Sequence, residues 1–411
     1  MVLLILISFL IEVGVLLYLE KKAWNTLYTP LNFLMLPYVV VLLITVAVCG
    51  HWGITDFYFP SILYWSVGLF LFAIPSCMLG FSLQRHDKPV MSPIRDDDDG
   101  GIWLFLTVVV CLAFLYRLKQ VLETSSAMLG SEEFGEDFDG HGIWAHLSKF
   151  YTPLLVMGIY YINRKRWWMI IPIIIMLAFS FLHQVKGWII IPCVAGLAMR
   201  LYSGRTRLDL KFILWVLAGG VSVFLISYIM ALVFGNNSAM GGYIIEFIMR
   251  HFVHYLTSGT LGFSMDLAAG MPDKGDTQVL FAQFVNIIHL FTGEPLISPI
   301  NSLYFHTGLN MTNVRTMFGT VAVYCNPARI AIVTLFLSFT MYMLRIMAIK
   351  FNNVYVYVIY FYQCALLCMG WFEYYFFHLD TIEVPFMSCL IWLIVYMWKG
   401  NKKVLNNESI Q

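Results

Sequence analysis

Long apolar runs alternate with short polar connections along the whole chain. Runs of this length and hydropathy indicate α-helices that cross a bilayer. Eleven of them cover residues 2–19, 31–49, 61–80, 102–117, 148–163, 168–182, 187–202, 212–234, 328–344, 354–372 and 384–398. The pattern therefore predicts an all-α polytopic integral membrane protein with about 11 transmembrane helices, folded as a single membrane domain over residues 1–411.

Two polar stretches interrupt this pattern. Residues 118–147 include five carboxylates within positions 132–139, which is typical of a solvated acidic loop. Residues 235–327 are too long for a simple connection and predict a functional or folded loop. Within them, positions 243–255 and 277–291 have apolar residues at helical spacing, the pattern of helices that lie in a membrane interface. Glycines at 259, 262, 270, 275 and 293 are expected to punctuate these helices.

The basic residues assign the two sides of the membrane. Lys21 and Lys22 follow the first apolar run, which places the N-terminus outside and the other end of that helix in the cytoplasm. With eleven helices, 17 of the 25 Lys and Arg residues then fall in cytoplasmic segments, and the C-terminus is inside. Both polar stretches become outer loops, residues 118–147 an acidic one and residues 235–327 a large one that carries the candidate active site.

Composition supports the membrane assignment and excludes other classes. The chain is 60% hydrophobic and 12% charged, far from the balance of a soluble domain. A net charge of +1 argues against nucleic-acid binding. The eight cysteines lie mostly inside apolar runs without paired spacing, and no sequence motif for a metal or a cofactor is present. No metal or cofactor is therefore expected, and any ligand on the outer face would be bound by Lys, Arg and His.

Ionisable groups at the predicted outer face are the candidates for chemistry. Lys186 lies in the tight turn between two very apolar helices, where the alternative is a lysine that snorkels to the interface. Arg250 and His254 are four residues apart and would share a helix face, with an interfacial helix touching lipid headgroups as the alternative. His306, Asn313 and Arg315 precede the run at 328–344, where an ordinary capped loop is the alternative.

Three short motifs give the chain a resemblance to a known family. These are Lys186-Gly187, the stretch Tyr-Leu-Thr-Ser-Gly at 255–259, and Asn-Val-Arg-Thr at 313–316. With the helix count and the large outer loop in the second half, the chain resembles the Wzy-type oligosaccharide repeat-unit polymerases of bacterial inner membranes. The family more often has arginine where Lys186 stands.

The resemblance implies a glycosyltransferase that polymerises undecaprenyl-diphosphate-linked repeat units of O-antigen, capsule or exopolysaccharide. The leaving group would be a lipid diphosphate, whose growing charge fixed cations stabilise without a metal. Lys186, Arg250 and Arg315 are expected to bind it. His254 or His306 would be the general base, and Tyr255 and Asn313 would contact sugars. A chain-length regulator and a flippase are the partners that the family implies.

Two other classes remain open on the sequence. One is another lipid-linked glycan transferase or ligase, which would share a diphosphate-binding outer face. The other is a non-enzyme, a flippase or transporter of lipid-linked oligosaccharides, which would carry charges along a central cavity and usually repeated halves. The apolar runs are almost free of charge in their cytoplasmic halves, and this favours chemistry at the outer surface.

Overall fold

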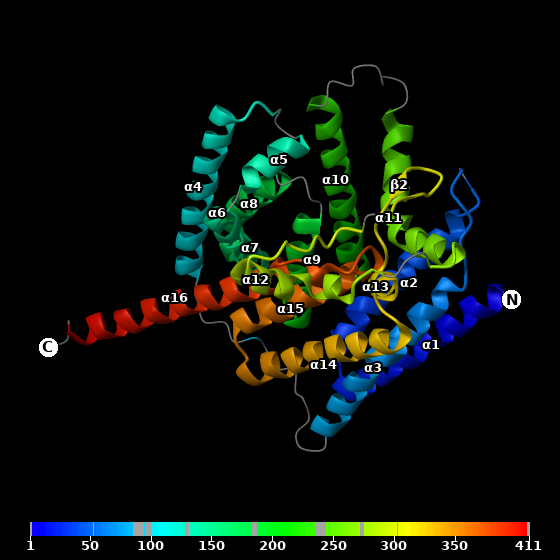
Figure 1. The fold of residues 1–411 in the computed structure, drawn as a ribbon. Helices are drawn as coiled ribbons and strands as arrows, with labels where there is room; N and C mark the ends of the chain where they lie inside the picture. The colour runs from blue at the N-terminus through cyan, green and yellow to red at the C-terminus, as the bar shows by residue number, and fades with distance from the viewer. Residues whose placement is uncertain are drawn as a thin grey trace. The chain divides into compact units, whose positions relative to one another are not determined.

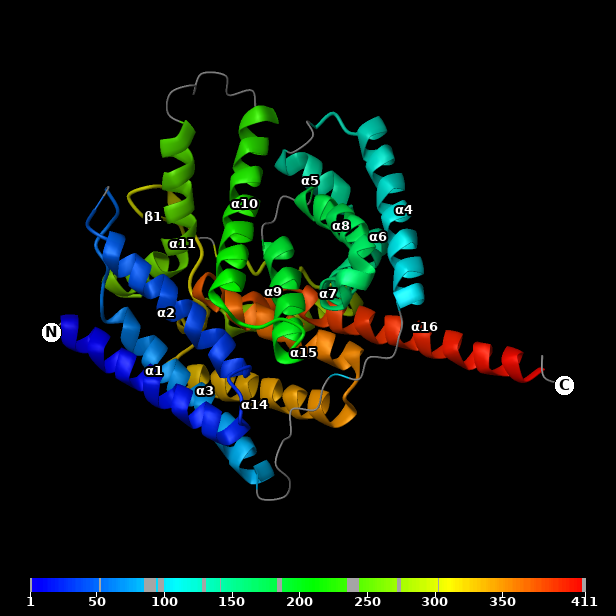
Figure 2. The ribbon, with the colours of Figure 1, turned by 180° about the vertical axis from the view of Figure 1, so that it is seen from behind.

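The protein consists almost wholly of α-helices (Figures 1 and 2). The computed structural model describes residues 2–51, 53–84, 94, 100–127, 131–140, 142–182, 187–234, 244–271, 275–301 and 303–408. The chain divides into two compact units, each assembled from three stretches of sequence. The first comprises residues 1–91, 243–349 and 363–381, and the second comprises residues 92–242, 350–362 and 382–411.

The first unit contains the N-terminal helices and the long segment that the sequence marks as functional. Its elements are α1 (Val2–Trp24), α2 (Pro30–Val48), α3 (Ser61–Gln84), α11 (Ile244–Ala268), η2 (Thr277–Phe281), α12 (Ala282–Thr292), β1 (Phe305–His306), β2 (Met311–Thr312), α13 (Met317–Tyr324), most of α14 (Pro327–Phe351), η3 (Met369–Trp371) and η4 (Tyr375–Phe377).

The second unit contains the middle of the chain. Its elements are α4 (Gly100–Thr124), α5 (Glu132–Asp139), α6 (Ile143–Ser148), α7 (Tyr151–Tyr161), η1 (Arg164–Met169), α8 (Ile170–Leu182), α9 (Gly187–Tyr202), α10 (Leu210–Phe234) and most of α16 (Asp380–Glu408). Helix α15 (Val354–Cys368) begins in this unit and ends in the first.

Eight helices in the described part of the chain are long and apolar enough to cross a membrane, and the chain is accordingly a multi-pass membrane protein. They are found at Leu3–Trp24, Pro30–Val48, Ser61–Leu83, Gly100–Thr124, Arg164–Leu182, Pro327–Phe351, Val354–Trp371 and Asp380–Lys399. Each of the other three predicted runs also forms a helix, but α7 has 11 residues and α9 has 16, and α10 counts among the shorter apolar helices over its described part. The all-α class is thus confirmed, and the count of eleven and the orientation stay predictions.

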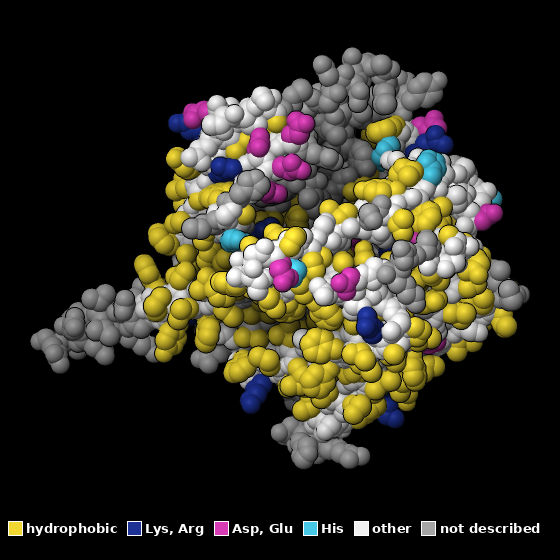
Figure 3. All heavy atoms as spheres, viewed as in Figure 1, with side chains coloured by type: hydrophobic (Ala, Val, Ile, Leu, Met, Phe, Trp, Pro, Cys, Tyr) yellow, Lys and Arg dark blue, Asp and Glu magenta, His cyan; other side chains and the backbone are white. Residues whose placement is uncertain are grey.

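Helix α14 has one apolar face suited to lipid and a second face that packs inside the first unit. Its outward positions Ile332, Phe336, Phe339, Met343 and Met347 recur at helical spacing and are exposed, and hydrophobic side chains cover this part of the surface (Figure 3). Such a surface is stable against lipid and unstable in water.

The inward face of α14 carries polar groups that are paired inside the first unit. Tyr342 donates to Glu20 at 3.0 Å, and Ser76 of α3 donates to the same carboxylate. Arg345 is 2% exposed, donates to the carbonyl of Tyr28 at 2.6 Å and lies over the Trp24 ring. Arg345 thus belongs to a buried polar network between α1, α3 and α14.

Residues 118–147, predicted as a solvated acidic loop, contain helices in the structure. They include the end of α4 and the short helices α5 and α6. Ser131 caps α5 by accepting from the Phe134 amide at 3.1 Å. Phe134 and Phe138, four residues apart, are buried, so that the carboxylates share the helix with an apolar stripe that anchors it.

Candidate functional site

A hollow of about 560 Å³ opens beside the first turns of α11 in the first unit. Its lining combines that helix with the loop before α3 and the tip of the β1–β2 hairpin, namely Gly53, Glu246, Met249, Arg250, Val253 and Leu309. Hollows of this size accommodate small-molecule ligands. Charged and histidine side chains gather at this end of α11 (Figure 3).

Arg250 is the cation of this hollow. Its Nη1 lies 3.8 Å from a Glu246 carboxylate oxygen one turn earlier, and the two side chains are 54% and 63% exposed. An exposed pair at this spacing contributes little to stability. The guanidinium can therefore exchange Glu246 for an incoming anion at small free-energy cost, and its planar fork suits phosphate oxygens.

The tip of the β1–β2 hairpin is in close contact with the loop before α3. Strands β1 and β2 pair antiparallel, with His306 opposite Met311. The Thr55 amide donates to the carbonyl of Thr307 at 3.0 Å. Gly308 has φ +92°, and a Cβ there would overlap the carbonyl of Gly53. Only glycine satisfies both the positive φ and the close approach.

His254 links α11 to the hairpin. It is 7% exposed, and its Nδ1 lies 3.1 Å from the Thr307 hydroxyl. The pKa of His254 is lowered to about 4, chiefly by burial and also by the neighbouring His251 and His306, against a backbone hydrogen bond to Met311 that raises it. The ring is therefore neutral at physiological pH and already engaged by the protein.

His306 is placed differently from His254. Its side chain is exposed on β1, and its Nδ1 accepts from the Gly308 amide at 3.0 Å. The sequence left the general base open between His254 and His306. Of these two residues, His306 has the accessible ring.

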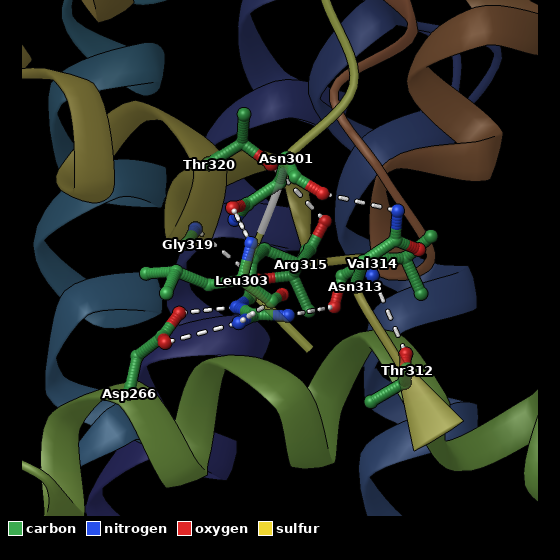
Figure 4. A network of polar contacts seen from close by, with 10 residues as sticks. Asp266, Asn301, Leu303, Thr312, Asn313, Val314, Arg315, Gly319 and Thr320 are labelled. Carbon is green, nitrogen blue, oxygen red and sulfur yellow. Dashed lines mark hydrogen bonds and ion pairs between the residues drawn. The ribbon is translucent and has the colours of Figure 1, made fainter. Parts of the chain in front are cut away.

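Arg315 is buried rather than open to the hollow. It is 1% exposed, and its Nη2 donates to Asp266 Oδ1 at 3.0 Å while its Nε donates to the other carboxylate oxygen (Figure 4). Further N–H groups donate to the carbonyls of Val314 and Leu303 at 3.1 and 3.4 Å, and the Phe305 ring lies 5.0 Å from the guanidinium. This arginine therefore ties α11 to the segment before α13.

The remaining predicted site residues are dispersed. Asn313 donates to the carbonyl of Asn301 at 3.1 Å and to the Tyr304 hydroxyl at 3.2 Å, so it braces the same segment as Arg315. Tyr255 stacks on Phe372 with ring centroids 5.5 Å apart. Lys186 lies outside the described residues. The structure thus brings Arg250, His254 and the His306 hairpin together.

Arg315 belongs to the other end of α11. Its partner Asp266 follows Arg250 by 16 residues, about 24 Å along a straight helix. A single diphosphate does not span that separation, so Arg250 and Arg315 do not act as one phosphate clamp in this arrangement.

Two carboxylates that the sequence analysis did not name, Asp266 and Glu373, lie close to Tyr324. Asp266 neutralises Arg315; burial raises the pKa of the Asp266 carboxyl, and the hydrogen bond and charge of Arg315 oppose that rise. Burial raises the pKa of Glu373 to about 7. Tyr324 lies close enough for its pKa to respond to Arg315, Glu373 and Asp266. Glu373 has a signal in the sequence, because it is the one non-aromatic residue in positions 371–377.

Within the described ranges, no three His, Cys, Asp or Glu side chains are grouped so that they could hold a metal ion.

Comparison with known proteins gives a family but no function. No curated protein and no solved structure matches the chain significantly. Residues 53–403 match the sequence profile of DUF6337, a family of unknown function, and the chain therefore belongs to that family.

Proposed function

We propose that this protein polymerises undecaprenyl-diphosphate-linked oligosaccharide repeat units by metal-independent glycosyl transfer at the outer face of the bacterial inner membrane. The observation that carries the proposal is the hollow beside α11, in which the partner of Arg250 among the described residues is an exposed carboxylate one helical turn away. A multi-pass chain that offers an arginine at such a hollow suits a ligand with a lipid tail and an anionic head.

The reaction would use this arginine at the leaving group. When the anomeric carbon of the donor is transferred, the bond to the lipid diphosphate breaks and the diphosphate gains negative charge. Two parallel N–H donors from Arg250 would stabilise that charge more in the transition state than in the ground state. The volume of about 560 Å³ is sufficient for a diphosphate with one or two sugars.

Arg315 has a positioning role in this proposal. Four of its N–H groups already donate to protein acceptors. It would hold the hairpin segment and α13 in register with α11, while Arg250 contacts the ligand. Binding of the diphosphate by Lys186 stays a prediction.

A glycan ladder assay tests the proposal. A polymerase-deficient host that makes a matching repeat unit is complemented with wild type, Arg250→Ala or Arg250→Lys at equal membrane expression. Arg329→Ala is the matched control, because Arg329 is another exposed arginine of the first unit and donates to Thr277 away from the hollow. We expect a ladder from wild type and the control, single capped repeats from Arg250→Ala, and a shortened ladder from Arg250→Lys.

The same assay separates the alternatives. If wild type restores repeats at the cell surface without any ladder, a flippase explains the protein better. If it moves a finished glycan to a new acceptor without extending it, a ligase does. A full ladder from Arg250→Ala would overturn the role given to the hollow.

A further inference from the structure

Helix α12 and the loop that follows it expose large apolar side chains. On the helix, Phe284, Ile288 and Phe291 recur at i, i+4 and i+7 and are 51%, 59% and 88% exposed. The value for Phe291 is the highest of any large apolar side chain in the described part of the chain. Leu296 and Ile300 of the loop are 59% and 64% exposed. We call these five side chains the α12 face. Apolar groups gathered in this way on one short segment indicate a surface that is covered in the native environment.

The polar side chains of the same segment are used inside it. Asn286 Nδ2 donates to the carbonyl of Ile297 at 2.9 Å, and the Ile297 amide donates to Asn286 Oδ1 at 2.7 Å. His289 Nδ1 lies 2.7 Å from the carbonyl oxygen of Pro295. Gly293 ends the helix at φ +75°, and the loop then returns along α12 (Figure 1). The segment thus satisfies polar groups internally and directs apolar groups outward, which is the arrangement that lipid requires.

The start of this segment is tied to the start of a membrane span. The Thr277 hydroxyl donates to the carbonyl of Tyr324 at 2.9 Å, and Arg329 Nη1 donates to the Thr277 hydroxyl oxygen at 3.0 Å. Arg329 lies in the first turn of α14, whose span covers Pro327–Phe351. The chain therefore enters α12 at the level of the membrane boundary. With 11 residues, α12 is about 16 Å long, too short to cross a hydrocarbon core of about 30 Å.

The far end of the loop is fixed as well. Asn313 donates to the carbonyl of Asn301 and to the Tyr304 hydroxyl, and Arg315 donates to the carbonyl of Leu303. Both ends of the segment are therefore held by the first unit, and the α12 face keeps a fixed position between them. Tyr304 is 55% exposed, and tyrosines are enriched at the headgroup level of a membrane.

The charge of the segment decides which partner fits it. Glu294 is the only Asp, Glu, Lys or Arg between positions 277 and 313, and its carboxylate lies 3.0 Å from His289 Nε2. The segment therefore has no cation for anionic headgroups and lacks the complementary charges that give protein partners their specificity. Acyl chains need neither.

We propose that the α12 face lies in the membrane boundary, with its apolar side chains among the acyl chains of the leaflet in which α14 begins. Glu294 and His289 stay at headgroup level, and insertion is driven by apolar area and not by headgroup charge. This extends the interfacial helix that the sequence predicts at 277–291 to the returning loop. The inserted segment sets the height of residues 301–316, including Arg315, relative to the bilayer. The inference uses the membrane assignment and does not depend on the proposed function.

Photo-labelling of wild-type protein in nanodiscs tests this placement. The probe is phosphatidylcholine with a diazirine near the carboxyl end of one acyl chain, and labelled peptides are identified by mass spectrometry. Residues 282–300 should be labelled within about threefold of the lipid-facing α14 positions 332–347, and equally when half of the lipid is phosphatidylglycerol. Residues 132–139 of the acidic helix α5 are the negative control. Labelling of 282–300 no higher than this control, or only with phosphatidylglycerol, would overturn the proposal.

A charge placed on the face gives a second test. Because Phe291 is 88% exposed, Phe291→Asp removes little packing, and it should lower acyl-chain labelling of 282–300 by at least about threefold. Met311→Asp, at a 47% exposed position of the β1–β2 hairpin, should leave that labelling unchanged. Undiminished labelling in Phe291→Asp would overturn the role of the α12 face.

Oligomeric mass in detergent separates lipid from a second copy of the chain as the partner. We expect the same mass for wild type, Phe291→Asp and Met311→Asp. A wild-type oligomer that Phe291→Asp dissociates, with no acyl-chain labelling of 282–300 in wild type, would assign the face to a second copy and overturn the proposal. If Phe291→Asp does not fold, the labelling of wild type decides by itself.

Discussion

Asp266 and Arg315 form a buried ion pair that joins the last turns of α11 to the segment before α13, 49 residues later in the chain. Both side chains are at most 3% exposed. The contact is bidentate, and the carbonyl of Leu303 accepts a further hydrogen bond from the same guanidinium. Removal of either residue would leave the other as an unpaired buried charge, which destabilises the fold.

The first prediction concerns this pair. Replacing Arg315 by Met leaves the Asp266 carboxylate buried and unpaired, and the free energy of unfolding should fall by about 3–5 kcal/mol. Asp266→Asn should be destabilising for the same reason. The double variant should lose less than the sum of the two single losses, because neither charge is then left alone. Unfolding in detergent, followed by tryptophan fluorescence, measures all three. Wild-type stability in Arg315→Met would contradict the pairing.

The second prediction separates Arg250 from Arg315. Among the described residues, Arg250→Ala removes an exposed pair with Glu246, so stability should change by less than about 1 kcal/mol. Binding of inorganic diphosphate to the purified protein should nevertheless weaken about tenfold or more, and calorimetry at low salt can measure it. Arg329→Ala provides the comparison in both assays. Equal binding by Arg250→Ala and wild type would exclude the hollow as the anion site.

The third prediction concerns close backbone contact. Gly259→Ala introduces a Cβ into the carbonyl oxygens of Phe372 and Trp371. Because neither backbone can move independently, we expect a loss of about 2–4 kcal/mol and a weaker stack between Tyr255 and Phe372. Gly14→Ala on α1 has open space around its Cβ and should be neutral or slightly stabilising. Similar melting curves for the two variants would show that α11 and the 371–377 segment are not packed as described.

The sequence predicts the helices well because long apolar runs have few other solutions. All eleven runs coincide with helices, and the amphipathic pattern at 243–255 is present in α11. The pattern did not predict that α11 continues to Ala268, because Gly259 and Gly262 suggest interruptions. Both glycines lie inside the helix because other backbone segments approach it there. Gly293 is a true helix end, with φ +75° at the C-cap of α12.

The candidate site was predictable only where its residues are neighbours on one helix. Arg250 and His254 follow from helical spacing, and Arg250 lines the hollow. Asp266 has no local pattern that marks it as the partner of Arg315, and burial of Arg315 is a tertiary property. Glu373 was missed because a single carboxylate among aromatic residues matches no known motif, although its position among them is visible in the sequence.

The last prediction is a pH dependence of stability at Glu373. Burial raises the pKa of Glu373 in the folded protein to about 7, above its ordinary value of 4.5. The folded state therefore holds this proton more tightly than the unfolded state. Its contribution to stability is fully present below about pH 4.5 and is lost as the pH rises through 7.

Glu373→Gln removes this titration, so the variant should gain stability relative to wild type between pH 5 and pH 8, by on the order of 1–3 kcal/mol. Unfolding in detergent at pH 5 and pH 8 measures this gain in stability. Glu294→Gln, at an exposed carboxylate of the first unit, should show no such gain. A Glu373→Gln variant that is less stable than wild type at pH 8 would contradict the prediction and would show that the carboxylate stabilises the fold.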